Sequence, residues 1–161
     1  MGKTTAAANQ TEDGDWSGDY RGPFLDGWIG DCVSCDRHTP LKGVGNHSFQ
    51  SPWGLDLDPQ GNIHVVAQGS NTIKVFSKEG VYVRMYGDPN GPRGLAIDDE
   101  GYSLVSECWG NCLSIYDPEG NKIHTVGNQE NPWGTALDPR DGSVFIANYG
   151  AKTVLKYCVN I

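Results

Sequence analysis

The chain has 161 residues and a formal net charge of −8 at pH 7, which is enough chain for one domain with its own core. Residues 48–161 contain eight Lys or Arg against thirteen Asp or Glu, a balance that argues against nucleic-acid binding because that function normally requires a basic face. No apolar stretch approaches the roughly 18 residues that span a bilayer, and residues 1–9 lack the apolar core of a signal peptide. We therefore expect a cytoplasmic protein, or a piece of a longer one.

The first part of the chain differs in composition from the rest. It is rich in Gly, Asp, Thr and Ala, so we expect residues 1–38 to be a flexible segment and residues 39–161 to form the folded domain. Cys32, Cys35 and His38 have a spacing typical of zinc sites, but a structural site needs four ligands. We expect free thiols, as is usual in the cytoplasm; half of a metal site completed elsewhere and a redox dithiol are the alternatives.

Short apolar runs bounded by turn residues follow this segment. In the first unit they predict four strands, each ended by Gly, Pro, Asn or Asp. A helix of ordinary length does not fit beside them, and no segment keeps a period of 3.6 residues. The expected strands cover residues 54–58, 63–67, 73–76 and 81–86.

Among the Pro-x-Gly triplets of the chain, three lie in register at intervals of 40 residues. The copies lie at residues 52–54, 92–94 and 132–134, and each is followed by an apolar run that ends in Asp. Four strands in a repeat of this length are typical of a β-propeller blade. The sequence therefore predicts an all-β fold, a partial β-propeller of about three four-stranded blades that forms an open arc or half of a six-bladed ring.

These repeats resemble the NHL-repeat family over residues 43–161. Its blades begin with Pro-x-Gly, and a triplet of Asn, any residue and an apolar residue opens the third strand, as it does here at Asn71 and Asn111. The third copy departs from the pattern with Lys152. The family often has Asp at the end of the second strand, where this chain has Ala67, Glu107 and Asn148.

The resemblance implies a function in recognition. NHL repeats are similar to the six-bladed propellers at the C-terminus of tripartite-motif ubiquitin ligases and translational regulators, and they also occur in extracellular proteins and a few lyases. It implies a non-catalytic protein-interaction module, which would be the substrate-recognition part of a ubiquitin-ligase-type protein. This chain has no RING or B-box cysteine array, so we do not expect it to transfer ubiquitin by itself.

Aromatic and Arg side chains mark the candidate binding face. In an up-and-down blade, the turn into the first strand and the turn between the second and third strands lie on the same side, where polar residues are usual. Trp, Tyr and Arg are the types that dominate binding hot spots, although these rings could instead be packing spacers between repeats. The candidate residues are Trp53, Arg93 and Trp133 in the first set of turns and Gln68, Trp109 and Tyr149 in the second.

Two other functions compete with protein binding. A metal-dependent propeller enzyme of lyase or hydrolase type would need charged or metal-ligating groups recurring around the channel, whereas His64 and His124 occupy different strands and are expected to be half-exposed. We therefore expect no catalytic group, metal or cofactor. A single-stranded RNA site would centre on Arg93, with Trp53 and Trp133 stacking on bases.

The strand order bears on closure of the ring. Residues 42–46 resemble the end of a fourth strand, as found again in residues 124–128. The folded part then reads as strand four, two whole blades and strands one to three, but three blades are too few to close. The sequence thus predicts either a homodimer that completes a six-bladed ring or a fragment of a longer six-bladed chain.

Overall fold

A computed structural model describes residues 50–158 of the protein. The expected flexible segment 1–38, the cysteine and histidine cluster at Cys32, Cys35 and His38, and the strand expected near residues 42–46 all lie outside the described residues. Those expectations stay predictions.

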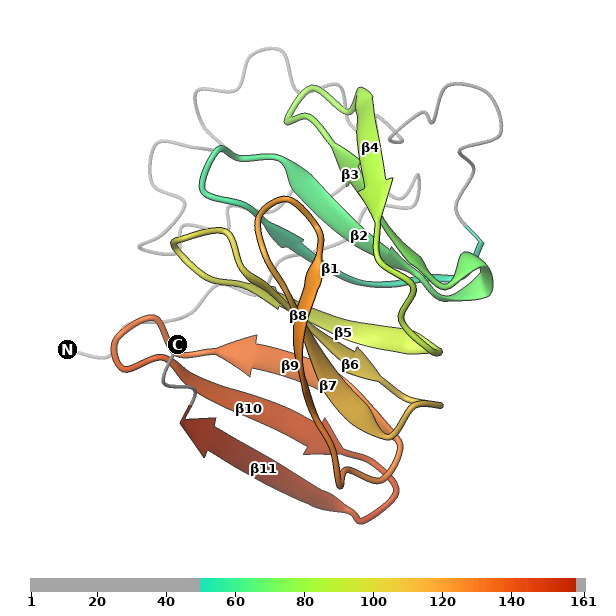
Figure 1. Ribbon diagram of the computed structural model, residues 1–161, viewed down its shortest axis with the longest axis vertical. Coiled ribbons are helices and arrows are strands. Elements are labelled where there is room, and N and C mark those ends of the chain that lie inside the picture. The colour runs from blue at the N-terminus through green and yellow to red at the C-terminus, as the bar shows by residue number, and fades with distance from the viewer. Residues whose placement is uncertain (1–49, 159–161) are drawn as a thin grey trace, which may run out of the picture. The chain divides into compact units, whose positions relative to one another are not determined.

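Within residues 50–158 the chain forms β-strands and one short 3-10 helix, arranged in three antiparallel sheets (Figure 1). The first sheet contains β1 (Pro52–Leu57), β2 (Ile63–Ala67), β3 (Thr72–Phe76) and β4 (Tyr82–Tyr86), with the helix η1 (Gln68–Ser70) between β2 and β3. The second contains β5 (Pro92–Ile97), β6 (Ser103–Glu107), β7 (Cys112–Tyr116) and β8 (Lys122–Val126). The third contains β9 (Pro132–Leu137), β10 (Ser143–Asn148) and β11 (Thr153–Cys158).

Each sheet is a meander in which strands adjacent in sequence are paired. The first strands of the three sheets, β1, β5 and β9, are neighbours in space, so the sheets are arranged around them as blades. The prediction of an all-β partial propeller is confirmed, with two four-stranded blades and a third of three strands among the described residues. No helix in this part of the chain is long and apolar enough to cross a membrane.

Two apolar clusters hold the blades together. The cluster between the first and second blades includes Val66, Ile73 and Leu95, which are at most 5% exposed. The cluster between the second and third blades includes Leu113 and Ile146, both fully buried. Burying an aliphatic side chain of this size contributes about 1.5–3 kcal/mol, so these interfaces stabilise the packing of neighbouring blades.

The acid that ends each first strand is explained by turn chemistry. The Asp58 carboxylate accepts hydrogen bonds from the backbone N–H groups of Gln60 and Asn62, and Asp98 repeats the arrangement in the second blade. Gly61 follows with a φ of 84°, a left-handed conformation that favours glycine. The recurring Asp therefore closes the turn between the first and second strands.

Candidate binding face

A bulge at the start of each first strand positions the candidate residues. The pairing of β1 with β2 shifts register between Pro52 and Leu55, and β5 and β9 show the same irregularity at their own Pro-x-Gly triplets. A bulge re-aims the side chain that it contains. In this way Trp53, Arg93 and Trp133, the middle residues of the triplets, come to lie at one end of the three neighbouring first strands.

Arg93 lies between the two tryptophans. Its Cζ atom is 4.4 Å from the ring centroid of Trp53 and 4.0 Å from that of Trp133. The centroids of the two indole rings are 5.5 Å apart and the ring planes meet at 71°, so both rings contact the guanidinium group from different sides. A cation–π contact contributes about 0.5–2 kcal/mol, depending on how far it is desolvated.

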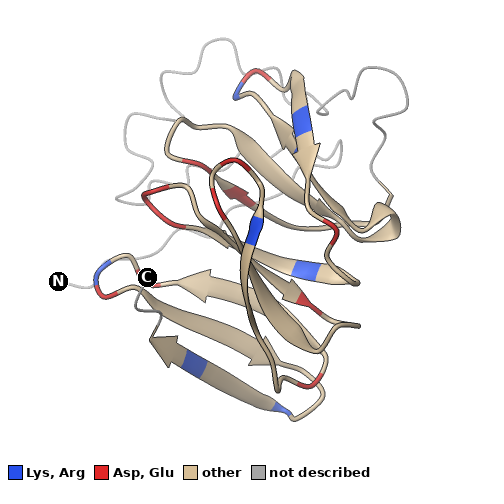
Figure 2. Cartoon of the chain, in the orientation of Figure 1, with Lys and Arg blue, Asp and Glu red and all other residues tan. Residues whose placement is uncertain are grey.

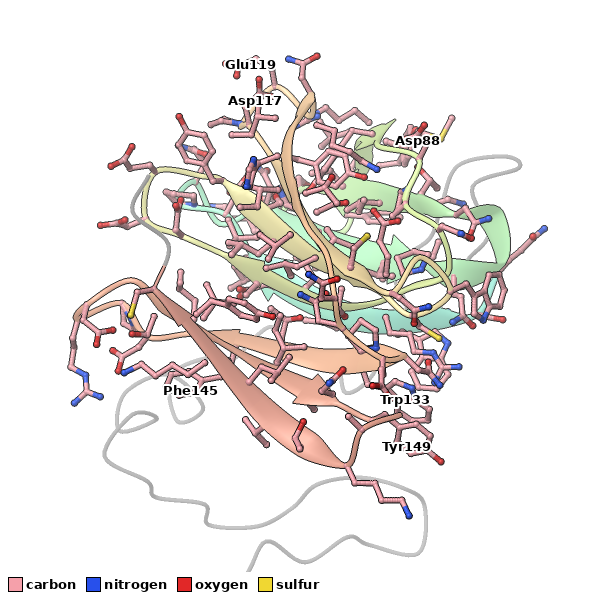
Figure 3. All side chains as sticks on the ribbon, turned by 60° about the horizontal axis from the view of Figure 1, so that its bottom comes forward. Asp88, Asp117, Glu119, Trp133, Phe145 and Tyr149 are labelled. Carbon is pink, nitrogen blue, oxygen red and sulfur yellow. The ribbon has the colours of Figure 1, made fainter. Side chains whose placement is uncertain are left out.

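Further contacts extend this cluster across the turns between second and third strands. The Tyr149 ring stacks on Trp133 with centroids 4.4 Å apart, and Trp53 Nε1 donates a hydrogen bond to Gln68 Oε1 over 3.1 Å. Figure 3 shows Trp133 and Tyr149 together at one end of the third sheet, away from Asp117 and Glu119. We call the contiguous set the aromatic face; it consists of Trp53, Gln68, Arg93, Trp133 and Tyr149.

Trp109 makes none of these contacts among the described residues. Its ring packs directly over Gly91, where an added Cβ would overlap the indole. It nevertheless leaves 59% of its surface exposed, as does Tyr149, and Trp53 is 47% exposed. Five of the six candidate residues are thus joined by direct contacts, while Trp109 stands apart from them.

The guanidinium group of Arg93 has unused hydrogen-bond donors. Its Nε and Nη1 atoms are buried without a partner, and within residues 50–158 the side chain forms no ion pair. A hollow of about 370 Å³ beside it is lined by Trp53, Trp133 and Thr135, whose buried hydroxyl also lacks a partner. Buried donors without partners cost about 1–3 kcal/mol each, so this arrangement of Arg93 is costly.

The opposite ends of the first strands are acidic. Acidic side chains gather on the turns that follow the first and third strands of the blades, for example at residues 98–100 and 117–119 (Figure 2). A hollow of about 500 Å³ lies there, lined by Asp56, Asp98 and Asp138 among apolar side chains. The Asp56 carboxylate accepts a hydrogen bond from the backbone N–H of Ile97, so it joins the first blade to the second.

The residues that end the second strands have structural roles. Glu107 is 4% exposed and accepts hydrogen bonds from Asn90 N at 2.8 Å, from Lys122 Nζ at 3.2 Å and from Ser114 Oγ. Asn148 Oδ1 likewise accepts a bond from the backbone N–H of Glu130 at 2.7 Å. Each side chain therefore holds the loop that enters its own blade.

The two strand histidines differ in burial, and the expectation that both are half-exposed is wrong. His64 is 3% exposed, whereas His124 is exposed. The imidazole of His64 contacts Asp58 Oδ2 at 3.2 Å and Tyr86 Oη at 2.9 Å, and Tyr86 Oη lies 2.8 Å from Ser103 Oγ of the second blade. Burial lowers the pKa of His64, and the contact with Asp58 opposes that shift.

Metal-ligating side chains do not converge in the described part of the chain. No group of three or more His, Cys, Asp or Glu residues within 50–158 is placed to hold a metal ion. In the Asp58–His64–Tyr86–Ser103 chain, Asp58 is half-buried and the other three residues are buried, and the chain joins the first blade to the second.

Comparisons with known proteins give the fold. A scan against protein-family models finds no match, and a search of curated proteins finds no significant similarity. Among solved structures, the chain is similar to a streptogramin B lyase, with a TM-score of 0.57 and 13% identity over 73% of this chain and 43% of the lyase. The calcium-binding protein regucalcin from Agrobacterium tumefaciens gives a TM-score of 0.55 and 16% identity over 67% of this chain and 45% of regucalcin.

A gluconolactonase from Xanthomonas campestris is also similar, with a TM-score of 0.54 and 20% identity over 63% of this chain and 36% of the enzyme. The neighbours are β-propeller-like proteins, which supports a propeller fold for this chain. The chain spans less than half the length of each of these three proteins. At such low identities the similarity concerns the fold alone.

Proposed function

We propose that this chain is a non-catalytic recognition module that binds a protein partner through the aromatic face. The observation that carries the proposal is the contact of Arg93 with the rings of both Trp53 and Trp133 at an exposed end of the blades. Residues of these types, packed against one another and still accessible, are those that dominate binding energy at protein interfaces. A surface patch of this composition is also unusual on turns, which are normally polar.

The finer form of the proposal follows the repeat pattern. The NHL-type triplets favour a substrate-recognition role in a ubiquitin-ligase-type protein, whose catalytic elements would lie outside these 161 residues. A cytoplasmic location is part of this proposal. Cys108, Cys112 and Cys158 are free thiols, which is the usual state of cysteine in a reducing compartment.

Capture from a cell lysate tests the proposal. Arg93→Ala and Trp133→Ala should each weaken retention of the partner by about 1–4 kcal/mol, with little change in melting temperature. Ile123→Ala is the matched control, since Ile123 is an apolar residue of β8 that is 49% exposed and lies outside the aromatic face. If the tryptophan variant unfolds and Arg93→Ala retains the same partner as the wild type, the aromatic face is a packing device and the proposal fails.

An enzyme is the second candidate, because the structural neighbours include a lyase, a gluconolactonase and a calcium-binding protein. Elemental analysis of the purified protein for calcium and zinc tests it, and a stoichiometric metal would favour this candidate.

RNA binding is a further candidate, through Arg93 with Trp53 and Trp133 stacking on bases. A mobility shift with pooled single-stranded RNA at low salt tests it. The acidic balance of residues 48–161 argues against a shift.

A further inference from the structure

The hydrogen-bond donors of Arg93 limit which chemical groups the aromatic face can bind. A guanidinium group carries five N–H donors and no acceptor. The described residues supply two ring faces to Arg93 but no hydrogen-bond acceptor, and Nε and Nη1 are buried away from bulk solvent. An occupant of the neighbouring hollow therefore has to bring acceptors, and a negative charge is favoured over a neutral group.

The walls of the hollow add a donor and apolar surface. Thr135 lines the hollow, and its buried hydroxyl has no partner. Gln68, which is 9% exposed and has an unpartnered Nε2, lies outside the lining but contacts Trp53. The orientation of the Gln68 amide is set by the indole N–H of Trp53, which donates to Oε1 and so leaves the NH₂ group unused. Rings at Trp53 and Trp133 border the same hollow, where they can contact apolar atoms of a ligand.

We propose that the hollow beside Arg93 binds a carboxylate group, supplied by an Asp or Glu side chain or by the C-terminus of the partner. This inference rests on the proposed function and gives the chemistry of the group that the aromatic face recognises. Because Nε and Nη1 have no accessible surface under the indole rings, binding has to move a ring aside. In the bound form, the carboxylate oxygens accept hydrogen bonds from the exposed guanidinium edge of Arg93, and the apolar atoms beside the carboxylate contact the indole rings.

A carboxylate fits better than a phosphate. Arg93 is a single cation, and a planar carboxylate matches one guanidinium edge with two parallel hydrogen bonds. Nucleic-acid sites use several cations that track successive phosphates, whereas the described part of the chain has eight basic residues spread over three blades against thirteen acidic ones.

Benzoate is a suitable small probe because it joins a carboxylate to a ring, and benzamide is its neutral counterpart of similar shape. In ¹⁵N NMR titrations of the full chain, benzoate should saturably shift the Arg93 Nε–H signal and the indole N–H signals of Trp53 and Trp133. Benzamide should shift them at least tenfold less at equal concentration. Equal shifts with both compounds, or no shift with benzoate at millimolar concentrations, would overturn the inference.

Variants and a second anion complete the test. Arg93→Gln should weaken benzoate binding at least tenfold, and Arg93→Lys should restore only part of it, because an ammonium group lacks the planar pair of donors. If phenyl phosphate binds more tightly than benzoate, the site belongs to phosphate ligands and the carboxylate inference is wrong. Loss of partner capture in Arg93→Ala, combined with no response to benzoate, would sink this inference while leaving the proposed function intact.

Peptides then distinguish the sources of the carboxylate. A short peptide that binds should lose affinity on amidation of its C-terminus if the terminal group occupies the hollow. It should lose affinity on Glu→Gln or Asp→Asn replacement if a side chain does. A peptide that binds and tolerates both changes contradicts the inference.

Discussion

At the scale of single residues, close packing of the first strands depends on glycine. A Cβ at Gly94 would overlap the Trp133 carbonyl oxygen and would lie 2.7 Å from both Thr135 N and Ser106 Oγ. The backbone atoms of β9 cannot move away without opening the contact between the second and third blades. The Gly of Pro-x-Gly is therefore required for the approach of neighbouring strands, which also brings Arg93 to Trp133.

We expect Gly94→Ala to destabilise the fold by about 2–4 kcal/mol, the cost of overpacking a site that cannot relax. Urea unfolding followed by tryptophan fluorescence measures it. Gly127→Ala is the matched control, since no atom lies within 4 Å of its added Cβ, and it should change stability by less than about 1 kcal/mol. Equal stability of the two variants would show that β5 and β9 are farther apart than described.

His64 makes the stability of the protein depend on pH. Because burial lowers its pKa from 6.5, the native state binds this proton less readily than the unfolded state does. Above 6.5 the group is neutral in both states and has no effect. As the pH falls below 6.5 the unfolded state takes up a proton first, so the free energy of unfolding falls, by at most about 1.4 kcal/mol per pH unit, until native His64 is protonated too.

The His64→Gln variant isolates this contribution. Glutamine has no proton to bind in this range, so the difference in unfolding free energy between wild type and variant should shrink as the pH is lowered from neutral to about 5. Chemical denaturation at a series of pH values measures it. A difference that is constant over that range would mean that His64 is protonated equally in both states.

At the scale of elements, the turn between second and third strands explains the asparagine of the repeat. Asn71 and Asn111 have φ values of 48° and 51°, and their side chains accept hydrogen bonds from the N–H groups of Gly91 and Asn131 in the next loop. Asparagine tolerates the left-handed conformation better than most residues. The third blade has Lys152 at the same position, with a φ of 55° and no such acceptor.

We therefore expect Lys152→Gly to stabilise the third blade by about 0.5–1 kcal/mol, because glycine removes the strain of a positive φ. Thermal unfolding measures it. Lys152→Ala is the control, since alanine keeps the strain and should bring no gain. A gain with alanine equal to that with glycine would assign the effect to loss of the lysine side chain and not to the backbone.

Turn residues explain how far the elements could be predicted from the sequence. Each expected strand of the first blade overlaps an observed one, since Gly, Asn and Asp fix the turns locally, as at Gly61 and Asn71. The bulges after Pro52 and its equivalents were not foreseen, because they depend on pairing with the second strand. The separation of Trp109 from the aromatic face was also not predicted. The Trp109 ring packs over Gly91, which has no side chain, in a neighbouring loop; the equivalent residue before the third blade is Asn131.

At the scale of the whole molecule, the first and third blades expose apolar residues at positions whose equivalents in the central blade are buried. Leu55 is 62% exposed, whereas its equivalent Leu95, covered by the first blade, is 5% exposed. Val154 is 72% exposed, whereas its equivalent Leu113, covered by the third blade, is fully buried. Each terminal face thus has the apolar residues of a blade interface, without a neighbouring blade among the described residues.

A second copy of the chain can supply those neighbours. Two sets of three blades give six, a number within the range of closed propellers, and the twofold arrangement places the third blade of each copy against the first blade of the other. Residues 42–46, whose sequence resembles the end of a fourth strand, are predicted to complete the partner's third blade beside β11. We therefore expect a homodimer at micromolar concentration, with a mass of twice 17.5 kDa in light scattering.

Val154→Asp places a charge on the terminal face and should convert the dimer to a monomer, because burying an unpaired carboxylate in an apolar interface is costly. Ile123→Asp is the matched control, since Ile123 is also an exposed aliphatic residue but belongs to the central blade, and it should leave the dimer intact. Deletion of residues 39–47 should also dissociate the dimer if strand exchange completes the blade. A wild-type monomer at micromolar concentration would rule out the ring of two copies and would favour a half-propeller taken from a longer chain.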